Sequence, residues 1–209
     1  MSGAGISTRR LEAFSDGVFA IAITLLVLTI AVPELTPDAL NRGELLQRLI
    51  ELWPKFLSFF ISFGIIGIFW VGHSIMFHYI KRTDRMLLWI NTALLMTVSF
   101  IPFPAALLGQ YARSQVAVVA YGATLVLAGL AFVVTWLYAS SGHRLIDPKL
   151  DPATIRLGTT AVFIAPIVYG IATLLSFVHP GISLTIYVLT PLLYIIPSPI
   201  DRLVDDMEE

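Results

Sequence analysis

Asp16 and His73 are two ionisable side chains that lie inside long apolar segments of the sequence. An ionisable group in a bilayer costs free energy unless it is paired, and it usually faces a bundle interior or a water-filled cavity. Such a pair could relay protons or couple the movement of two ions. No nucleophile accompanies the pair inside the apolar segments, so these residues do not indicate an intramembrane enzyme and we predict no catalytic residues.

Cysteine and histidine usage excludes further chemistry. The chain has no cysteine, which removes disulfides, thiolate metal sites and cysteine nucleophiles. The four histidines lack the i, i+4 spacing of a helical metal site; they are His73, His78, His143 and His179. We therefore expect no metal site and no cofactor.

The composition predicts that these residues are held by membrane helices. Of 209 residues, 57% are hydrophobic and 13% are charged, whereas a soluble domain carries about 25% charged residues. The net charge of -1 gives no indication of a nucleic-acid partner. Since a spanning helix needs about 20 residues, we predict an all-α, single-domain membrane protein (residues 1–200) with six transmembrane helices. The expected spans are 14–32, 56–80, 87–108, 116–138, 157–177 and 182–196.

The connections between the spans predict the topology. Residues 37–52 have the pattern of a short amphipathic segment on the membrane surface, and residues 201–209 form an acidic tail. With the N-terminus inside, nine of the 13 Lys and Arg residues fall on the inner side and four on the outer side. Positive residues are concentrated on the cytoplasmic side of membrane proteins, so both termini are expected to be cytoplasmic.

One face of the first span allows two interpretations. At 100° per residue, a stripe about 60° wide contains four residues: Gly17, Ile21, Thr24 and Leu28. Around an axis shared by several copies, this stripe would form a narrow, mostly apolar path that could control ion passage by dewetting. Small and hydroxylated residues also occur at helix–helix contacts, and periodicity alone favours that packing interpretation.

Polar residues near the first span predict a network that holds it. Asp16 lies about 100° from the stripe, so it should face a neighbouring helix. Trp70 and His73 are three residues apart and share a helix face. The candidate members of a buried network are Arg10, Ser15, Asp16, His73 and Asn91, with Trp70 beside them. Helix capping by Ser15 and Asp16, and an isolated satisfied His73, are the alternatives.

The first half of the chain resembles a known family. Arg10-x-x-x-Phe14-Ser15-Asp16, followed by Gly-Val-Phe-Ala-Ile-Ala-Ile-Thr, is similar to the signature of transmembrane protein 175, the endolysosomal potassium channel, and its prokaryotic homologues. The likeness continues through Phe69-Trp70-x-x-His73 and Leu88-Trp89-x-Asn91. The resemblance implies a homotetramer in a prokaryotic plasma membrane that conducts potassium ions passively, with weak to moderate selectivity.

The resemblance also implies roles for individual residues. In the family the first helix lines the pore, which places an apolar constriction at Ile21, a threonine ring at Thr24 and further rings at Leu25 and Leu28, with Gly17 on the same path. The resemblance gives a structural role to the motif residues Arg10, Phe14, Ser15 and Asp16, with Trp70, His73 and Asn91 as their partners. The alternative function is a proton- or ion-coupled secondary transporter that uses Asp16 and His73.

Overall fold

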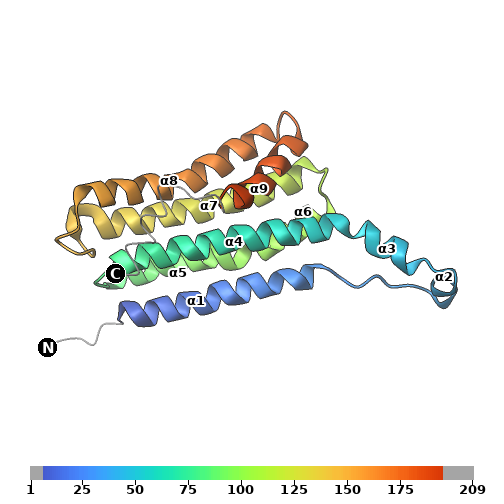
Figure 1. Ribbon diagram of the computed structural model, residues 1–209, viewed down its shortest axis with the longest axis horizontal. Coiled ribbons are helices and arrows are strands. Elements are labelled where there is room, and N and C mark those ends of the chain that lie inside the picture. Colours follow the sequence, from blue (N-terminus) through green and yellow to red (C-terminus); the bar gives the residue numbers. More distant parts are fainter. Residues whose placement is uncertain (1–6, 195–209) are drawn as a thin grey trace.

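The computed structural model describes residues 7–194, which form a bundle of long helices running back and forth along one axis (Figure 1). The α-helices are α1 (Thr8–Leu25), α2 (Pro37–Asn41), α3 (Leu45–Glu51), α4 (Trp53–Tyr79), α5 (Arg85–Phe100), α6 (Pro102–Gln110), α7 (Gln115–Ser140), α8 (Pro152–Leu175) and α9 (Pro180–Tyr194). Two short 3-10 helices, η1 (Leu26–Thr29) and η2 (Ser141–His143), follow α1 and α7.

The helix lengths confirm the all-α membrane architecture. Within residues 7–194, five helical segments are long and apolar enough to cross a membrane: Thr8–Thr29, Trp53–Tyr79, Arg85–Gln110, Gln115–His143 and Pro152–Leu175. The helix at the predicted sixth span is α9, which is apolar but has 15 residues. The end of that predicted span and the acidic tail at 201–209 lie outside the described residues.

Proline positions explain two features of the bundle. The third span is divided because α5 ends at Phe100 and α6 begins at Pro102. Proline lacks the N–H that a helix interior needs but is tolerated in the first turn. Pro166 lies inside α8 and packs closely on α7, where a Cβ added to Gly129 would lie 2.8 Å from the Pro166 Cδ. Glycine at this point therefore permits the close approach of α7 and α8.

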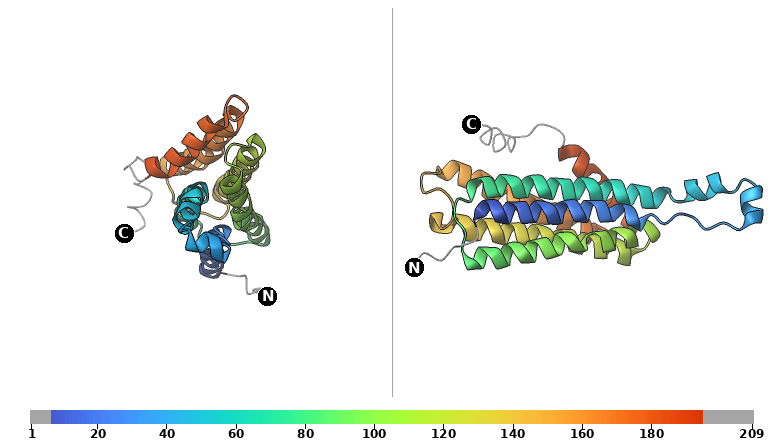
Figure 2. Two further views of the ribbon diagram at one scale, coloured as in Figure 1. Left: turned by 90° about the vertical axis from the view of Figure 1, so that its right-hand side faces the viewer. Right: turned by 90° about the horizontal axis from the view of Figure 1, so that it is seen from below.

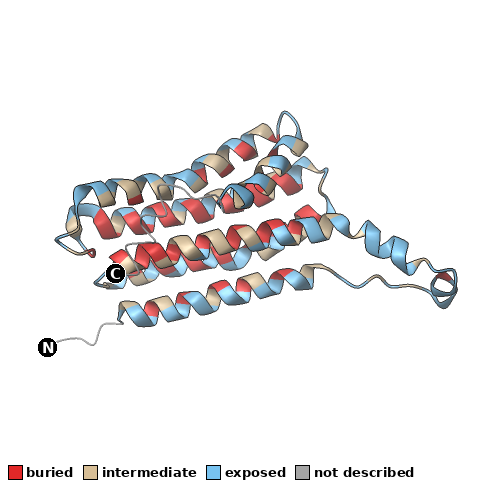
Figure 3. Cartoon of the chain, viewed as in Figure 1, coloured by how far each residue is buried: buried red, intermediate tan, exposed pale blue. Residues whose placement is uncertain are grey.

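The arrangement of the helices leaves α1 at one edge. It packs against α4, α5 and α6, while α8 packs on α7 at the opposite edge (Figures 1 and 2). Colouring by burial shows buried residues along one side of α1 and exposed residues along much of the rest (Figure 3). Because α1 lies at the edge, a second molecule or the membrane can reach its outer side.

The segment expected to form one amphipathic element instead forms two short helices. The turn between α2 and α3 contains Gly43 at φ +74°, a left-handed conformation that glycine adopts without a Cβ penalty. Both helices extend beyond the end of the bundle along its long axis (Figure 1). Contact of this segment with a membrane surface stays a prediction.

Asp84 connects the two loops at the other end of the bundle. Its Oδ1 accepts a hydrogen bond from the Leu87 N–H at 2.8 Å and caps α5, while its Oδ2 accepts one from the Tyr138 hydroxyl at 2.6 Å. The Arg144 Nε lies 3.5 Å from the same Oδ2. Partial burial of Asp84 opposes ionisation, but the hydrogen bonds from Tyr138 and Leu87 and the Arg144 charge outweigh it, so the pKa of Asp84 is lowered.

We expect Asp84→Ala to destabilise the fold by about 1–2 kcal/mol, because it removes a helix cap and the bond from Tyr138. Asp84→Asn keeps an acceptor for the cap and should cost less. Because the folded-state pKa is lowered, the Asp84 contribution is present above the ordinary carboxyl pKa of about 3.9 and is lost as pH falls through the lower folded value.

Thermal unfolding of the purified protein in detergent, at neutral and at acidic pH, measures this difference. Glu34→Ala, at an exposed acidic position, is the control and should leave Tm unchanged. Equal Tm values for wild type and Asp84→Ala at neutral pH would contradict the assigned role.

Candidate functional site

One side of α1 and η1 is held against the rest of the bundle. Buried residues recur every three or four positions, as expected for a helix with one packed face. They are Leu11, Ser15, Phe19, Ala22 and Leu26, none of them more than 6% exposed. The contacting helices are α4, α5 and α6. This face fixes the rotation of α1 about its own axis.

The predicted stripe lies on the side of α1 that no other helix of the chain covers. At 100° per residue, its centre is about 150° from the centre of the buried face. Ile21 is 60% exposed and Leu28 is 75% exposed, while Gly17 and Thr24 are also exposed. The Thr24 hydroxyl donates to the Ile21 carbonyl at 2.9 Å. The Thr24 Oγ1 can still accept a hydrogen bond or coordinate a cation.

Two more of the predicted residues flank this stripe. Leu25 is 41% exposed and Phe14 is 59% exposed, and both lie on the uncovered half of α1. Large apolar side chains that a single chain leaves uncovered on a membrane helix face either lipid or another copy of the chain. The rotation of α1 therefore presents Gly17, Ile21, Thr24 and Leu28 together, with bulkier side chains at their margin.

A buried chain of hydrogen bonds joins three helices. The Ser15 hydroxyl donates to the Leu11 carbonyl at 2.9 Å, and the Asn91 Nδ2 donates to the Ser15 Oγ at 3.0 Å. The Asn91 Oδ1 lies 3.0 Å from the His73 Nε2. Since the amide N–H is directed to Ser15, the His73 Nε2 carries the proton and donates. Ser15, Asn91 and His73 are each at most 1% exposed, so this chain ties α1 to α5 and α4.

Aromatic rings enclose the His73 side chain. The Phe77 ring stacks on it with centroids 4.3 Å apart, and the Phe19 ring lies 5.5 Å away at an angle of 60°. Neither phenylalanine was predicted from the sequence as a partner of the motif. Phe77 is four residues after His73 and Phe19 is four after Ser15, so the i, i+4 neighbours of the motif are the signal that could have identified them.

Asp16 forms a separate contact. Its Oδ1 accepts a hydrogen bond from the Trp70 Nε1 at 2.9 Å, and Trp70 is 44% exposed. The Asp16 and His73 side chains thus have different partners. The structure does not bring Arg10 into this network, because its side chain forms no hydrogen bond or ion pair with any residue between 7 and 194. The structural role of Arg10 in the motif stays a prediction.

The described part of the chain also contains no group of three or more His, Asp or Glu side chains that could hold a metal ion. The Ser15–Asn91–His73 hydrogen bonds fix α1 against the bundle, and the stripe lies on its exposed side.

Comparison with known proteins identifies the family. The family model described as "Endosomal/lysosomal potassium channel TMEM175" matches residues 10–102. A protein of Streptomyces collinus named as a potassium channel is 38% identical over 189 residues, which cover 88% of this chain and 90% of the relative. A potassium channel of Chamaesiphon minutus is 39% identical over 179 residues, covering 84% and 87%. The chain belongs to the TMEM175 family.

A solved structure extends the TMEM175 relationship to the fold. The crystal structure of a lysosomal potassium-selective channel TMEM175 homolog from Chamaesiphon minutus superposes with a TM-score of 0.79 at 35% sequence identity. The match covers 90% of this chain and 95% of that one, so it includes the second half that the family model leaves out. The relatives are channels and not enzymes, which confirms the prediction of a multi-pass membrane channel protein without catalytic activity.

Proposed function

We propose that this chain forms a homotetrameric pore, lined by α1, that conducts potassium passively with weak to moderate selectivity over sodium. One observation carries the proposal: the stripe that contains Ile21 lies opposite the face that Ser15 and Asn91 hold in place. The names of the two bacterial relatives support potassium as the permeant ion. The tetramer follows the family resemblance given by the Arg10-to-Asp16 motif.

The chemistry of the stripe indicates how such a pore would act. Four Ile21 side chains around an axis make an apolar ring, and an ion that passes it must give up part of its hydration shell. Potassium holds its shell less tightly than sodium and loses less. The backbone of α1 is a regular helix up to Leu25, so its carbonyls are used in intrahelical bonds and cannot replace the lost water. The Thr24 oxygens would offer one polar ring beyond the constriction, which is consistent with modest selectivity.

The same proposal includes the orientation in a prokaryotic plasma membrane. The start of α1, the α4–α5 turn and the α7–α8 loop lie at one end of the bundle (Figure 1). That end carries positive residues at Lys81, Arg82, Arg85, Arg144 and Lys149. By the positive-inside rule this end, with the start of α1, lies in the cytoplasm. The six-span topology predicted from the sequence puts the C-terminus, which lies outside the described residues, on the same side.

The coupled-transporter alternative receives less support. A relay between Asp16 and His73 needs the two groups to exchange a proton directly or through close intermediates. Asp16 instead accepts from Trp70, and His73 donates to Asn91 inside an aromatic enclosure. Each group therefore has a partner that favours a fixed structural role.

Reconstitution into liposomes tests the proposed function. We expect potassium to move down its own gradient, with or without a protonophore that collapses any proton gradient. Light scattering in detergent should give four times the chain mass of 23.0 kDa. Flux that requires a proton or sodium gradient would support coupled transport instead, and a folded monomer would contradict the pore.

A further inference from the structure

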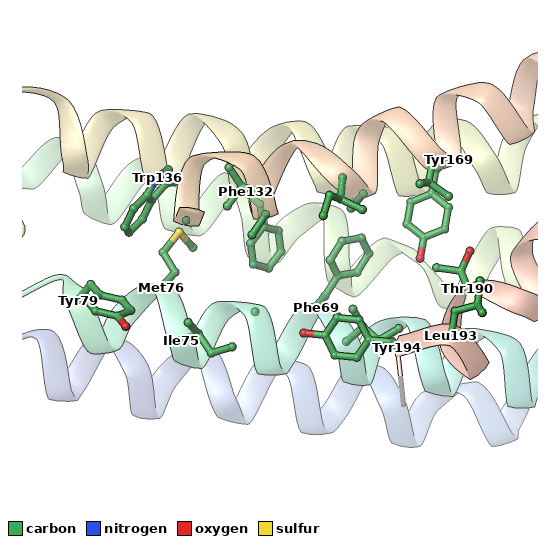
Figure 4. A pocket seen from close by; sticks show the side chains of 18 of the residues that line it. Phe69, Ile75, Met76, Tyr79, Phe132, Trp136, Tyr169, Thr190, Leu193 and Tyr194 are labelled. Atoms are coloured by element: carbon green, nitrogen blue, oxygen red, sulfur yellow. The ribbon is translucent and has the colours of Figure 1, made fainter. Parts of the chain in front are cut away.

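A cavity of about 350 Å³ lies between α4, α7, α8 and α9, away from α1 (Figure 4). Helix α8 packs on α7, whereas α4 reaches α7 through side chains such as Phe69, whose ring stacks on Phe132 with centroids 5.3 Å apart. Small residues on α4 and α8, among them Gly72, Ala161 and Ala165, leave space between these two helices. Its volume falls at the lower end of the range of small-molecule sites, about 300–1,000 Å³. The space is therefore large enough for an organic molecule.

The lining is apolar and uncharged. Aromatic and sulfur-containing side chains supply much of the wall: Phe69, Met76, Phe132, Trp136 and Tyr169. Among the described residues, no Asp, Glu, Lys or Arg lines the cavity. An ionised ligand inside the bilayer would find no counter-charge here, and burying an unpaired charge is costly. The occupant must therefore be neutral.

The Tyr169 hydroxyl is the feature that specifies a ligand. Tyr169 is 2% exposed, its hydroxyl is directed into the cavity (Figure 4), and it forms no hydrogen bond with any described residue. Other polar groups of the wall are already bonded: the Trp136 Nε1 donates to the Thr159 Oγ1 at 2.9 Å and the Thr190 hydroxyl donates to the Ile186 carbonyl at 2.8 Å. Although Tyr169 is buried as a residue, its hydroxyl oxygen reaches the open space of the cavity, so its hydrogen-bond partner would be a molecule in that space.

A water molecule is a poor partner for Tyr169. An ordered buried water needs two to four polar partners, and the wall has few hydroxyls, among them that of Thr190, so water at Tyr169 would leave most of the apolar cavity unfilled. A plain hydrocarbon chain fills the volume but leaves the hydroxyl unpaired. A molecule with an apolar body and one neutral oxygen can pack against the apolar wall and also form a hydrogen bond with the Tyr169 hydroxyl.

The cavity is open to the outside of the bundle. Ile164 of α8 and Leu193 of α9 line it and are 45% and 60% exposed. From Tyr169 the lined surface of α8 continues to Gly158, a distance of about 16 Å along the helix. An elongated molecule dissolved in the membrane can therefore enter from the side.

We propose that this cavity binds an uncharged, single-chain lipid whose one hydroxyl or carbonyl oxygen forms a hydrogen bond with the Tyr169 hydroxyl. The hydrocarbon chain lies between α4 and α8 and extends from Tyr169 toward Gly158. The site is separate from the α1 stripe, and its test does not depend on ion flux.

Photolabelling of the full-length protein in phosphatidylcholine vesicles tests the site. The probe is tetradecanol with a diazirine near the end of its chain, and peptide mass spectrometry locates the adducts. Labelling should be saturable and should fall on α4 and α8 residues of the cavity wall. Unlabelled tetradecanol should compete better than tetradecane or ionised tetradecanoate.

Two pairs of variants sharpen the test. Tyr169→Phe should weaken competition by tetradecanol about tenfold, the size of one hydrogen bond in an apolar site, without lowering Tm. Tyr121→Phe removes a buried hydroxyl that is bonded to Ser62 at 2.9 Å outside the cavity, so it should lower Tm and keep the labelling. Ala165→Trp fills the cavity and should abolish labelling, while Ile167→Trp on the exposed side of α8 should not.

Three results would overturn the proposal. If tetradecanol competes with the probe as well in Tyr169→Phe as in the wild type, the hydroxyl does not bind the lipid. Equal competition by tetradecane and tetradecanol would make the cavity a groove for hydrocarbon alone. Non-saturable labelling, or adducts outside the wall, would show that the cavity takes no such lipid.

Discussion

Ile21→Trp is expected to abolish potassium flux in liposomes without preventing assembly. Ile21 is 60% exposed on the uncovered side of α1 and makes no part of the buried face, so the larger side chain should not disturb the fold of the chain. Four indole rings around the proposed axis would fill the space through which an ion must pass. We expect flux to fall at least a hundredfold, to the level of protein-free vesicles.

Ile21→Ala should have the opposite effect on the same ring. Shorter side chains widen the constriction and admit more water, so the difference between the dehydration costs of potassium and sodium should shrink. We expect flux to rise and the potassium-to-sodium ratio to fall toward one. Both quantities are measured as reversal potentials and rates in planar bilayers or with ion-sensitive dyes in vesicles.

Ile167 provides matched controls for both changes. It is also an isoleucine on a spanning helix, it is 55% exposed, and it lies on α8 far from the α1 stripe. Ile167→Trp and Ile167→Ala should conduct as wild type does. Normal flux through a properly assembled Ile21→Trp protein would show that residue 21 does not line the path.

Asn91→Ala is expected to cause the largest loss of stability among single changes in the motif, about 2–4 kcal/mol. The substitution removes two hydrogen bonds. The Ser15 hydroxyl and the His73 Nε2 stay buried, and each loses its bond to Asn91. Hydrogen bonds between membrane helices contribute about 0.6–2 kcal/mol each, and an unsatisfied buried group costs about 1–3 kcal/mol. With α1 no longer fixed to α4 and α5, flux should fall together with Tm.

A double-mutant cycle separates the network from general damage. Ser15→Ala with Asn91→Ala removes both ends of one bond, so the double variant should cost less than the sum of the single variants. Asn41→Ala, at an exposed asparagine in α2, is the control and should leave Tm unchanged. Strictly additive losses would mean that Ser15 and Asn91 act independently.

Much of the helical architecture was predictable from sequence because its causes are local. Long apolar stretches in a chain with few charges must form helices in lipid, where every backbone N–H and C=O needs an internal partner. The predicted span 56–80 and the helix Trp53–Tyr79 agree within a few residues, and Pro102 marked the division between α5 and α6. The stripe through Ile21 followed from helical periodicity alone.

The partners of the motif were predictable in part. The types of Ser15, His73 and Asn91 indicated a buried polar network, because such groups must find hydrogen bonds inside a bilayer. Which of them meet depends on the rotation and offset of three helices, and those quantities are set by packing across the bundle. For this reason Asp16 was grouped with His73 in sequence, whereas in the structure it pairs with Trp70.

What the sequence by itself determined is therefore the set of helices and the face of α1 that carries Ile21. Only the tertiary structure decided that this face is left uncovered, that Arg10 stands apart from the buried network and that the Tyr169 hydroxyl opens into a cavity. Helix formation responds to neighbours three and four residues away along the chain. Exposure and cavities depend on side chains that tens of residues separate, so no local pattern records them.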